Sequence, residues 1–283
     1  YGSIEWLGVE PDGGEEVPGD DLRGAGIGSE GMFGVVTRVL VRLMKTPPAY
    51  KTFLGVFDSV DQASETVSDI IAAGIVPAAL EMMDQLITQA LEEAYHFGFP
   101  LDAGAVLIVE LDGLAKGVEQ QARRGEEICR QNNAREVRLA KDATERAALW
   151  KCRKRAFGAI GRLSPNYVTQ DGVVPRSRLP EIMRFIRSVS DKHRLRIPNV
   201  FHAGDGNIHP LILYDERDPD QVKRALQAGD DILSKCIELG GSVTGEHGIG
   251  AEKIDFMSRQ FAEDDLEAMQ QLRRVFDPDK RCN

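Results

Sequence analysis

The chain has 283 residues, of which 42% are hydrophobic and 28% charged, and its formal net charge at pH 7 is −10. This length fits one large domain or two modest ones, and the composition is typical of globular proteins. The acidic balance argues against a nucleic-acid partner, and no apolar run is long enough to predict a transmembrane segment. The four cysteines are scattered without a CxxC pair, which predicts reduced thiols and a cytoplasmic location.

The first glycine-rich motif spans residues 26–31 and matches the pattern G-x-G-x-x-G. A dinucleotide-binding fingerprint needs a strand before it and a helix after it. Here no strand pattern precedes the motif, and the alternating, β-branched residues 35–43 after it predict a strand. The context therefore excludes a Rossmann fingerprint. The glycines still indicate backbone that approaches a ligand, or a turn with unusual dihedral angles.

Strand and helix patterns alternate beyond Pro47-Pro48. Strands are predicted over residues 52–57, 77–83, 105–111, 136–139 and 167–174. Helices are predicted over residues 59–73, from the end of the second strand to Tyr95, and over 115–131, 142–160, 179–193, 219–239 and 264–276. The order of the leading elements is that of a ferredoxin-like domain. We therefore expect an α+β fold, with a ferredoxin-like antiparallel sheet and flanking helices.

Two histidines flank a predicted hairpin turn near the C-terminal end. Asp205-Gly206 is a strong two-residue turn signal between apolar runs, and it predicts that His202 pairs directly with His209. Directly opposed side chains lie roughly 4.5–5.5 Å apart at Cβ, so two imidazoles placed in this way can chelate one divalent cation. The alternative is that these histidines only cap or hydrogen-bond the hairpin.

A second glycine-rich motif, Gly245-Glu246-His247-Gly248, offers a third ligand. Glu246 would complete a His₂Glu set, which is a catalytic pattern when one coordination position stays open. His247 in the same motif is a potential ligand or acid/base group. In an extended loop, neighbouring side chains point in opposite directions, so Glu246 and His247 are expected to serve different groups.

These motifs, together with Gly-Ser-Glu-Gly at 28–31 and Trp150-x-x-Arg153, resemble the FAD-linked oxidases of the vanillyl-alcohol-oxidase type. The resemblance is greatest to the branch that holds the FAD-bearing D subunits of bacterial glycolate oxidases and the cytochrome-linked D-lactate dehydrogenases. It implies that residues 49–283 are the C-terminal, substrate-binding domain. Residues 1–48 would be the incomplete C-terminal part, or remnant, of an α+β FAD-binding domain. We therefore expect a fragment that does not hold FAD tightly, in which side chains such as Val35, Val39 and Val41 lack neighbours.

The resemblance also implies a role for individual residues. His202, His209 and Glu246 match the ligands of a divalent metal, zinc or manganese, and His247 matches the proposed catalytic base. Arg153 matches an arginine that binds the substrate carboxylate. The residues that match the lining of the FAD site are Gly28, Ser29, Gly31 and Val35.

The implied activity is oxidation of a 2-hydroxy acid by hydride transfer to FAD. Leu211 and Phe157 are apolar where relatives that act on dicarboxylic acids tend to be polar, which favours a small substrate such as glycolate or D-lactate. An iron–sulfur or other electron-accepting subunit is the implied partner, and it could hold the protein at the inner membrane. Two alternatives remain open: a metal-dependent hydrolase that uses the same site, and a non-catalytic, metal-stabilised docking domain.

Overall fold

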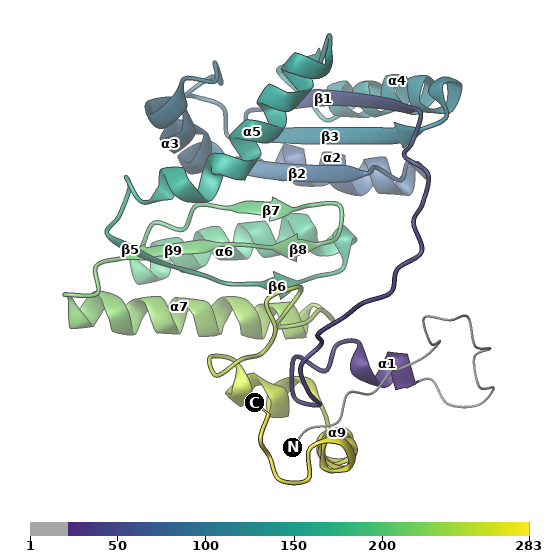
Figure 1. Ribbon diagram of the computed structural model, residues 1–283. Coiled ribbons are helices and arrows are strands. Elements are labelled where there is room, and N and C mark those ends of the chain that lie inside the picture. Colours follow the sequence, from purple (N-terminus) through teal and green to yellow (C-terminus); the bar gives the residue numbers. More distant parts are fainter. Residues whose placement is uncertain (1–21, 283) are drawn as a thin grey trace. The chain divides into compact units, whose positions relative to one another are not determined.

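The structure, a computed structural model, describes residues 22–282. The described chain falls into two compact units, one formed by residues 46–247 and the other by residues 22–45 with 248–282. Residues 1–21, which belong to the segment expected to be part of an FAD-binding domain, lie outside the described residues. Each unit is treated by itself below, and Figure 1 labels the elements.

The larger unit contains most of the regular structure. Its elements are β1 (Ala49–Phe57), α2 (Val60–Ala72), β2 (Ala79–Asp84), α3 (Gln85–Tyr95), β3 (Ala105–Gly113), α4 (Ala115–Gln131), β4 (Glu136–Leu139), α5 (Ala143–Ile160), β5 (Asn166–Thr169), β6 (Gly172–Val173), η1 (Arg176–Arg178), α6 (Leu179–His193), β7 (Val200–His202), β8 (Asn207–Ile208), β9 (Leu211–Tyr214) and α7 (Pro219–Glu238).

Seven strands form one antiparallel sheet in the order β4-β1-β3-β2-β7-β8-β6, and β5 pairs with β9 in a separate two-stranded sheet. The first four strands alternate with α2 and α4 and take the ferredoxin-like order, so the predicted fold class is confirmed. The helix α3 is inserted between β2 and β3. The sheet then continues through β7 and β8, which bear the first histidine motif.

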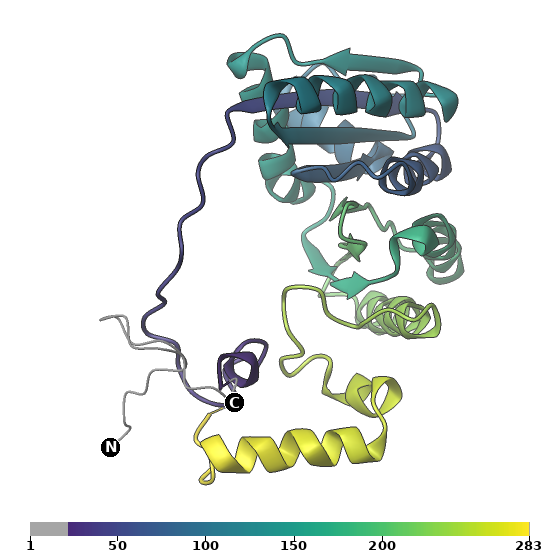
Figure 2. The same ribbon diagram turned by 90° about the vertical axis from the view of Figure 1, so that its right-hand side faces the viewer.

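Helices cover both faces of this sheet, and each face has its own apolar core. Residues of α2, α4, α6 and α7 pack on one face, and residues of α3 and α5 pack on the other. In Figure 2 the green helices α6 and α7 lie side by side to the right of the strands. Since side chains alternate along β2, Leu80 and Met82 enter the first core, while Met83 enters the second. Glu81 shares the second face and therefore lies under α5.

The hairpin register differs from the predicted one. His202 pairs with Asn207 rather than with His209, because the turn spans residues 203–206 and is centred one residue before the predicted Asp205-Gly206. Gly206 has φ of 74°, and a Cβ atom there would lie 2.2 Å from the carbonyl oxygen of Val174, so this position requires glycine. The shift equals two residues, the side-chain period of a strand, so His202 and His209 still share a face.

Two predicted strands are wrong in detail. The segment 167–174 is split into β5 and β6, which belong to different sheets, because the chain leaves β9 after Thr169 and joins β8 at Gly172. Residues 35–43 form no strand, since no neighbouring strand supplies hydrogen bonds to them among the described residues. Val35, Val39 and Val41 are exposed, as expected for side chains without neighbours.

The smaller unit contains α1 (Leu22–Gly26), η2 (Ile254–Phe256), α8 (Met257–Gln260) and α9 (Glu263–Phe276). Within this unit, the Glu30 carboxylate accepts a hydrogen bond of 2.6 Å from the Ile249 amide. Phe33 stacks on Phe276 with ring centroids 4.8 Å apart. In the described part of the chain, none of the helices combines the length and apolar character needed to cross a membrane.

Asp84 links the end of β2 to the strand that carries His202. Its carboxylate caps α3 at the Ile87 amide and accepts two hydrogen bonds from Asn199, which directly precedes β7. Burial raises the pKa of Asp84 to about 6, although the Asn199 and Ile87 donors oppose that rise. A carboxyl group whose pKa is higher in the folded state than in the unfolded state lowers the free energy of unfolding when it is ionised. For Asp84 this loss of stability is absent below about pH 4 and complete above about pH 6.

The pH dependence of stability is expected to reveal this cost. We expect the free energy of unfolding of the wild type, minus that of Asp84→Asn, to fall by roughly 2–3 kcal/mol between pH 4 and pH 7, since one pKa unit is worth about 1.4 kcal/mol. Chemical denaturation of both proteins across this range measures the difference. A difference that stays constant or rises with pH would contradict the assignment.

Candidate active site

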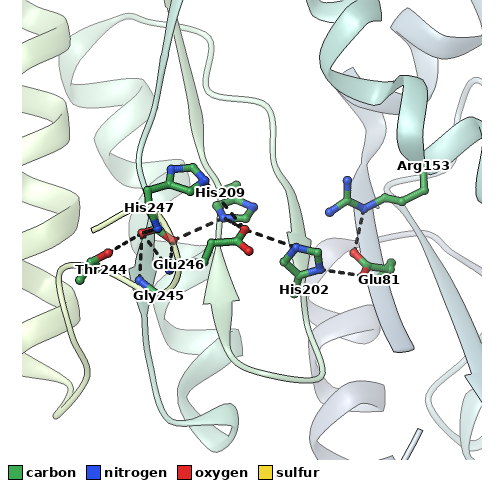
Figure 3. A network of polar contacts seen from close by, with 9 residues as sticks. Glu81, Arg153, His202, His209, Thr244, Gly245, Glu246 and His247 are labelled. Carbon is green, nitrogen blue, oxygen red and sulfur yellow. Dashed lines mark hydrogen bonds and ion pairs between the residues drawn. The ribbon is translucent and has the colours of Figure 1, made fainter. Parts of the chain in front are cut away.

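The larger unit brings three of the predicted site residues together at the end of the β7–β8 hairpin (Figure 3). Glu246 Oε1 lies 3.5 Å from His202 Nε2 and 3.2 Å from His209 Nε2. The two imidazole rings meet edge to face, with their centroids 5.4 Å apart. One atom from each residue lies within 4.8 Å of the other two, so the three side chains could hold one metal ion. The geometry is the one that the metal hypothesis required, and metal binding itself stays a prediction.

His209 supplies the test of whether this group fits a metal. Its side chain is only 2% exposed, and both ring nitrogens are buried without a hydrogen bond of normal geometry in the described residues. Nε2 instead lies near two carboxylate oxygens, of Glu246 at 3.2 Å and of Asp171 at 3.5 Å, and a buried nitrogen in such surroundings is expected to have a function. A His₂Glu donor set is one that zinc accepts at catalytic sites. The residues therefore fit a divalent cation at Nε2 of His209.

Glu81 connects the histidine group to Arg153. Glu81 Oε1 lies 2.7 Å from Nδ1 of His202, and Oε2 accepts a 2.8 Å hydrogen bond from Nε of Arg153 on α5. Burial raises the pKa of Glu81, but the hydrogen bond with His202 and the charge of Arg153 outweigh it and hold this pKa below its usual value. The hydrogen bond with Glu81 raises the pKa of His202. His202 and Arg153 thus share one ionised, buried carboxylate.

The fully buried Asp171 shapes the loop that presents Glu246 and His247. Its carboxylate accepts hydrogen bonds from the hydroxyl of Thr244 and from the amides of Gly245, Glu246 and His247, at 2.8–3.3 Å. Burial raises the pKa of Asp171, but the adjacent His209 ring and the loop donors hold it far below the usual range. The loop therefore wraps around a single anion.

This wrapped loop corrects the expectation that Glu246 and His247 point in opposite directions. His247 Nε2 lies 3.8 Å from Glu246 Oε1, and the His247 ring stacks on His209 with centroids 5.1 Å apart. The physical reason is that the loop is bent around Asp171 and is not an extended strand. His247 remains about half exposed, so its ring is open to a ligand from solvent.

The other predicted residues are divided between the units. Phe157 lies in the larger unit, with its ring 6.4 Å from the His209 ring, and Leu211 is fully buried there. The residues expected to contact FAD belong to the smaller unit: Gly28, Ser29, Gly31 and Val35. Both Gly28 and Gly31 have φ of 79°, as a tight, glycine-dependent turn requires, and a Cβ atom at Gly28 would meet nothing within 4 Å. This loop fits close approach of a ligand to backbone.

The sequence did not reveal the network roles of the two buried carboxylates: Glu81 was interpreted as a helix cap that could touch the cofactor, and Asp171 was given no role. Glu81 interrupts an otherwise apolar strand, and Asp171 follows Gln170 inside a predicted strand. A charged residue in such a position is seldom buried unless it is paired, so each was a detectable sign of a buried polar network.

Comparison with known proteins identifies the family of this site. The family model for FAD linked oxidases, C-terminal domain, matches residues 46–283. The chain belongs to this family. The structure of p-cresol methylhydroxylase with substrate bound has a TM-score of 0.64 at 15% sequence identity, over 83% of this chain and 52% of that one, which supports the fold alone.

Two curated relatives of this FAD-linked oxidase chain carry functional names. It is 47% identical to glycolate oxidase subunit GlcD of Escherichia coli (strain K12), over 94% of the chain and 53% of the relative. It is 31% identical to the probable mitochondrial D-lactate dehydrogenase of Danio rerio, again over 94% of the chain and 53% of the relative. The chain thus spans about half the length of these proteins.

Proposed function

We propose that the protein containing this chain oxidises a small 2-hydroxy acid, glycolate or D-lactate, to the 2-oxo acid, with FAD as the hydride acceptor. The observation that carries the proposal is the continuous polar network in which Glu81 joins Arg153 to the His202, His209 and Glu246 group. The names of the two relatives support the same class of substrate.

His202, His209 and Glu246 would hold a zinc or manganese ion in this protein. When bound, that ion would supply a Lewis acid for the substrate hydroxyl, and FAD would supply the redox chemistry. Gly28, Ser29, Gly31 and Val35 would contribute part of the surface that holds FAD.

The side chains of the larger unit orient the substrate and move its proton. Arg153 uses Nε for Glu81, which leaves its two terminal nitrogens for a bidentate contact with the substrate carboxylate. His247 accepts the proton of the hydroxyl group, because its imidazole is about half exposed and its Nε2 lies 3.8 Å from Glu246 Oε1, beside the proposed ligands. The apolar Phe157 and Leu211 offer no partner to a second carboxylate, which favours glycolate or D-lactate.

Electrons then need an acceptor beyond the flavin. The relative from Escherichia coli is named a subunit, which supports a partner protein. We therefore propose an electron-accepting subunit, an iron–sulfur protein or another carrier, and a cytoplasmic location with peripheral attachment to the inner membrane through that partner.

A substrate screen of the full-length protein tests the proposal. The enzyme is mixed with glycolate, D-lactate, L-lactate or D-2-hydroxyglutarate, and reduction of the flavin absorbance is followed, with a dye as terminal acceptor. Glycolate or D-lactate is expected to give the highest kcat/KM. A full-length protein that lacks flavin absorbance, or a flavin that none of these acids reduces, would contradict the function and favour a metal-dependent hydrolase.

A further inference from the structure

Glu81 is a buried carboxylate that contacts two different functional side chains. It is 6% exposed, lies on β2, and faces His202 of β7 directly in the strand register. Burying a carboxylate is costly unless it is paired and hydrogen-bonded. Each of its two oxygens has one close partner, His202 at 2.7 Å and Arg153 at 2.8 Å. The carboxylate therefore ties a residue of the sheet to a residue of α5.

The first contact fixes which nitrogen of His202 is available. A carboxylate at Nδ1 holds the proton on that nitrogen, so the lone pair lies on Nε2. Nε2 is the atom that faces Glu246 Oε1, at 3.5 Å. Glu81 thereby sets both the tautomer and the orientation of the ring toward the proposed metal ligands.

The second contact fixes the guanidinium group of Arg153. Because Glu81 takes Nε, the plane of the group is fixed, and in Figure 3 the two terminal nitrogens point away from Glu81. Within the described part of the chain, Arg153 makes no hydrogen bond through these two nitrogens. They are thus presented as a fork, which is the arrangement that a carboxylate binds best.

The structure of the substrate requires a fixed distance between the metal-binding group that includes His202 and the guanidinium group of Arg153. A 2-hydroxy acid bears its hydroxyl and its carboxylate on adjacent carbons, so the group that polarises one and the group that binds the other must be spaced to match. A misplacement of about 1 Å can cost on the order of 10²-fold in rate. Glu81 contacts both His202 of β7 and Arg153 of α5, although these two residues are 49 positions apart in the chain.

We propose that Glu81 is a positioning residue that sets the separation between His202 and Arg153, and so matches the site to the adjacent hydroxyl and carboxylate of a 2-hydroxy acid. The inference rests on the proposed function, because it assigns Glu81 to the same site.

Substitution of Glu81→Gln in the full-length protein tests this role. Glutamine keeps the size of the side chain but presents one acceptor instead of two, so it cannot satisfy both His202 and Arg153 as hydrogen-bond donors. We expect the metal-free variant to bind Zn²⁺ or Mn²⁺ about 10–100-fold more weakly in competition with a chromogenic chelator, as is typical for loss of an outer partner of a ligand. We also expect KM for the preferred acid to rise by about 10-fold or more, which is the same order as the expected decrease in metal affinity.

Glu110 offers a matched control. It is also 6% exposed, lies on β3 on the same sheet face, and binds the same helix through Arg146 and Trp150. Its hydrogen bonds come from Thr52, Arg146 and Trp150, and not from His202 or Arg153. Glu110→Gln should therefore lower the melting temperature while metal affinity and KM stay within about threefold of the wild type, a change below 1 kcal/mol.

A second variant keeps the test decisive if Glu81→Gln does not fold. Glu81→Asp retains the charge that Arg153 needs, but it is one methylene shorter and cannot reach both partners. It should fold, and it should shift metal affinity, KM or both. The proposal is overturned if the folded Glu81 variants leave metal affinity and KM at wild-type values, or if Glu110→Gln changes them equally. A wild-type protein that binds no metal and oxidises no 2-hydroxy acid would instead overturn the proposed function, and this inference with it.

Discussion

Replacing His202 with asparagine in the full-length protein is expected to remove the bound metal and the activity together. His202 is one of only three side chains in the proposed ligand group, and asparagine cannot place a nitrogen lone pair at the position of Nε2. The loss in metal affinity should exceed the roughly 10–100-fold that loss of an outer partner typically costs. Elemental analysis of the purified protein and chelator competition measure it, and flavin reduction by the preferred acid should become undetectable.

His193 is the matched control for this substitution. Like His202, it pairs with a carboxylate, Asp231, at 2.7 Å, but it lies at the end of α6 and belongs to neither of the two possible metal-binding groups in the described residues. His193→Asn should retain its metal even if its stability falls. A His202→Asn protein with the metal content of the wild type would refute the ligand assignment.

The helices of the larger unit were predicted well because their signals are local. Residues 115–131 and 179–193 have the bounds of α4 and α6. Ser59 and Asp142 cap α2 and α5 through hydrogen bonds to amides two or three residues onward. Both the apolar spacing and the cap lie within the segment itself, so no distant partner is needed to recognise them.

Strand partners depend on distant segments, and there the sequence was insufficient. The apolar run 208–213 after the predicted hairpin turn is not one strand: it forms β8 and then β9, which pair with β6 and β5 of different sheets. Pro210 lies between them and lacks the amide hydrogen that would continue the hydrogen-bond ladder. His202 and His209 lie close together although the predicted register is wrong, because a shift by two residues keeps a side chain on the same face of the strand.

The buried network shows the same limit at the site. The two histidine motifs were recognisable because each concentrates polar side chains between glycines in a short segment. Glu81, in contrast, is 72 residues from Arg153 and 121 from His202, and Asp171 is 73–76 residues from the loop that it organises. Only the folded sheet brings these carboxylates to their donors, so their roles could not be derived from spacing.

Replacing His247 with asparagine is expected to slow flavin reduction by about 10²–10⁴-fold, the usual contribution of a general base. The bond that fixes this residue in the loop runs from its backbone amide to Asp171, and the substitution keeps that amide. Glu246 should therefore stay in place, and the metal content should remain that of the wild type. Stopped-flow measurement of flavin reduction in the full-length protein, with elemental analysis of the same sample, separates the two effects.

The arrangement of the site makes each alternative outcome informative. Ligand atoms of Asp171, His209 and His247 also lie within 4.8 Å of one another, so loss of metal from His247→Asn would make His247 a ligand instead of the base. A variant that reduces its flavin within a factor of about three of the wild type would exclude the base role, because that change is less than about 1 kcal/mol of barrier. Slow reduction with full metal content is the one result that a proton-accepting His247 predicts, since only the imidazole nitrogen has been removed from an otherwise intact loop.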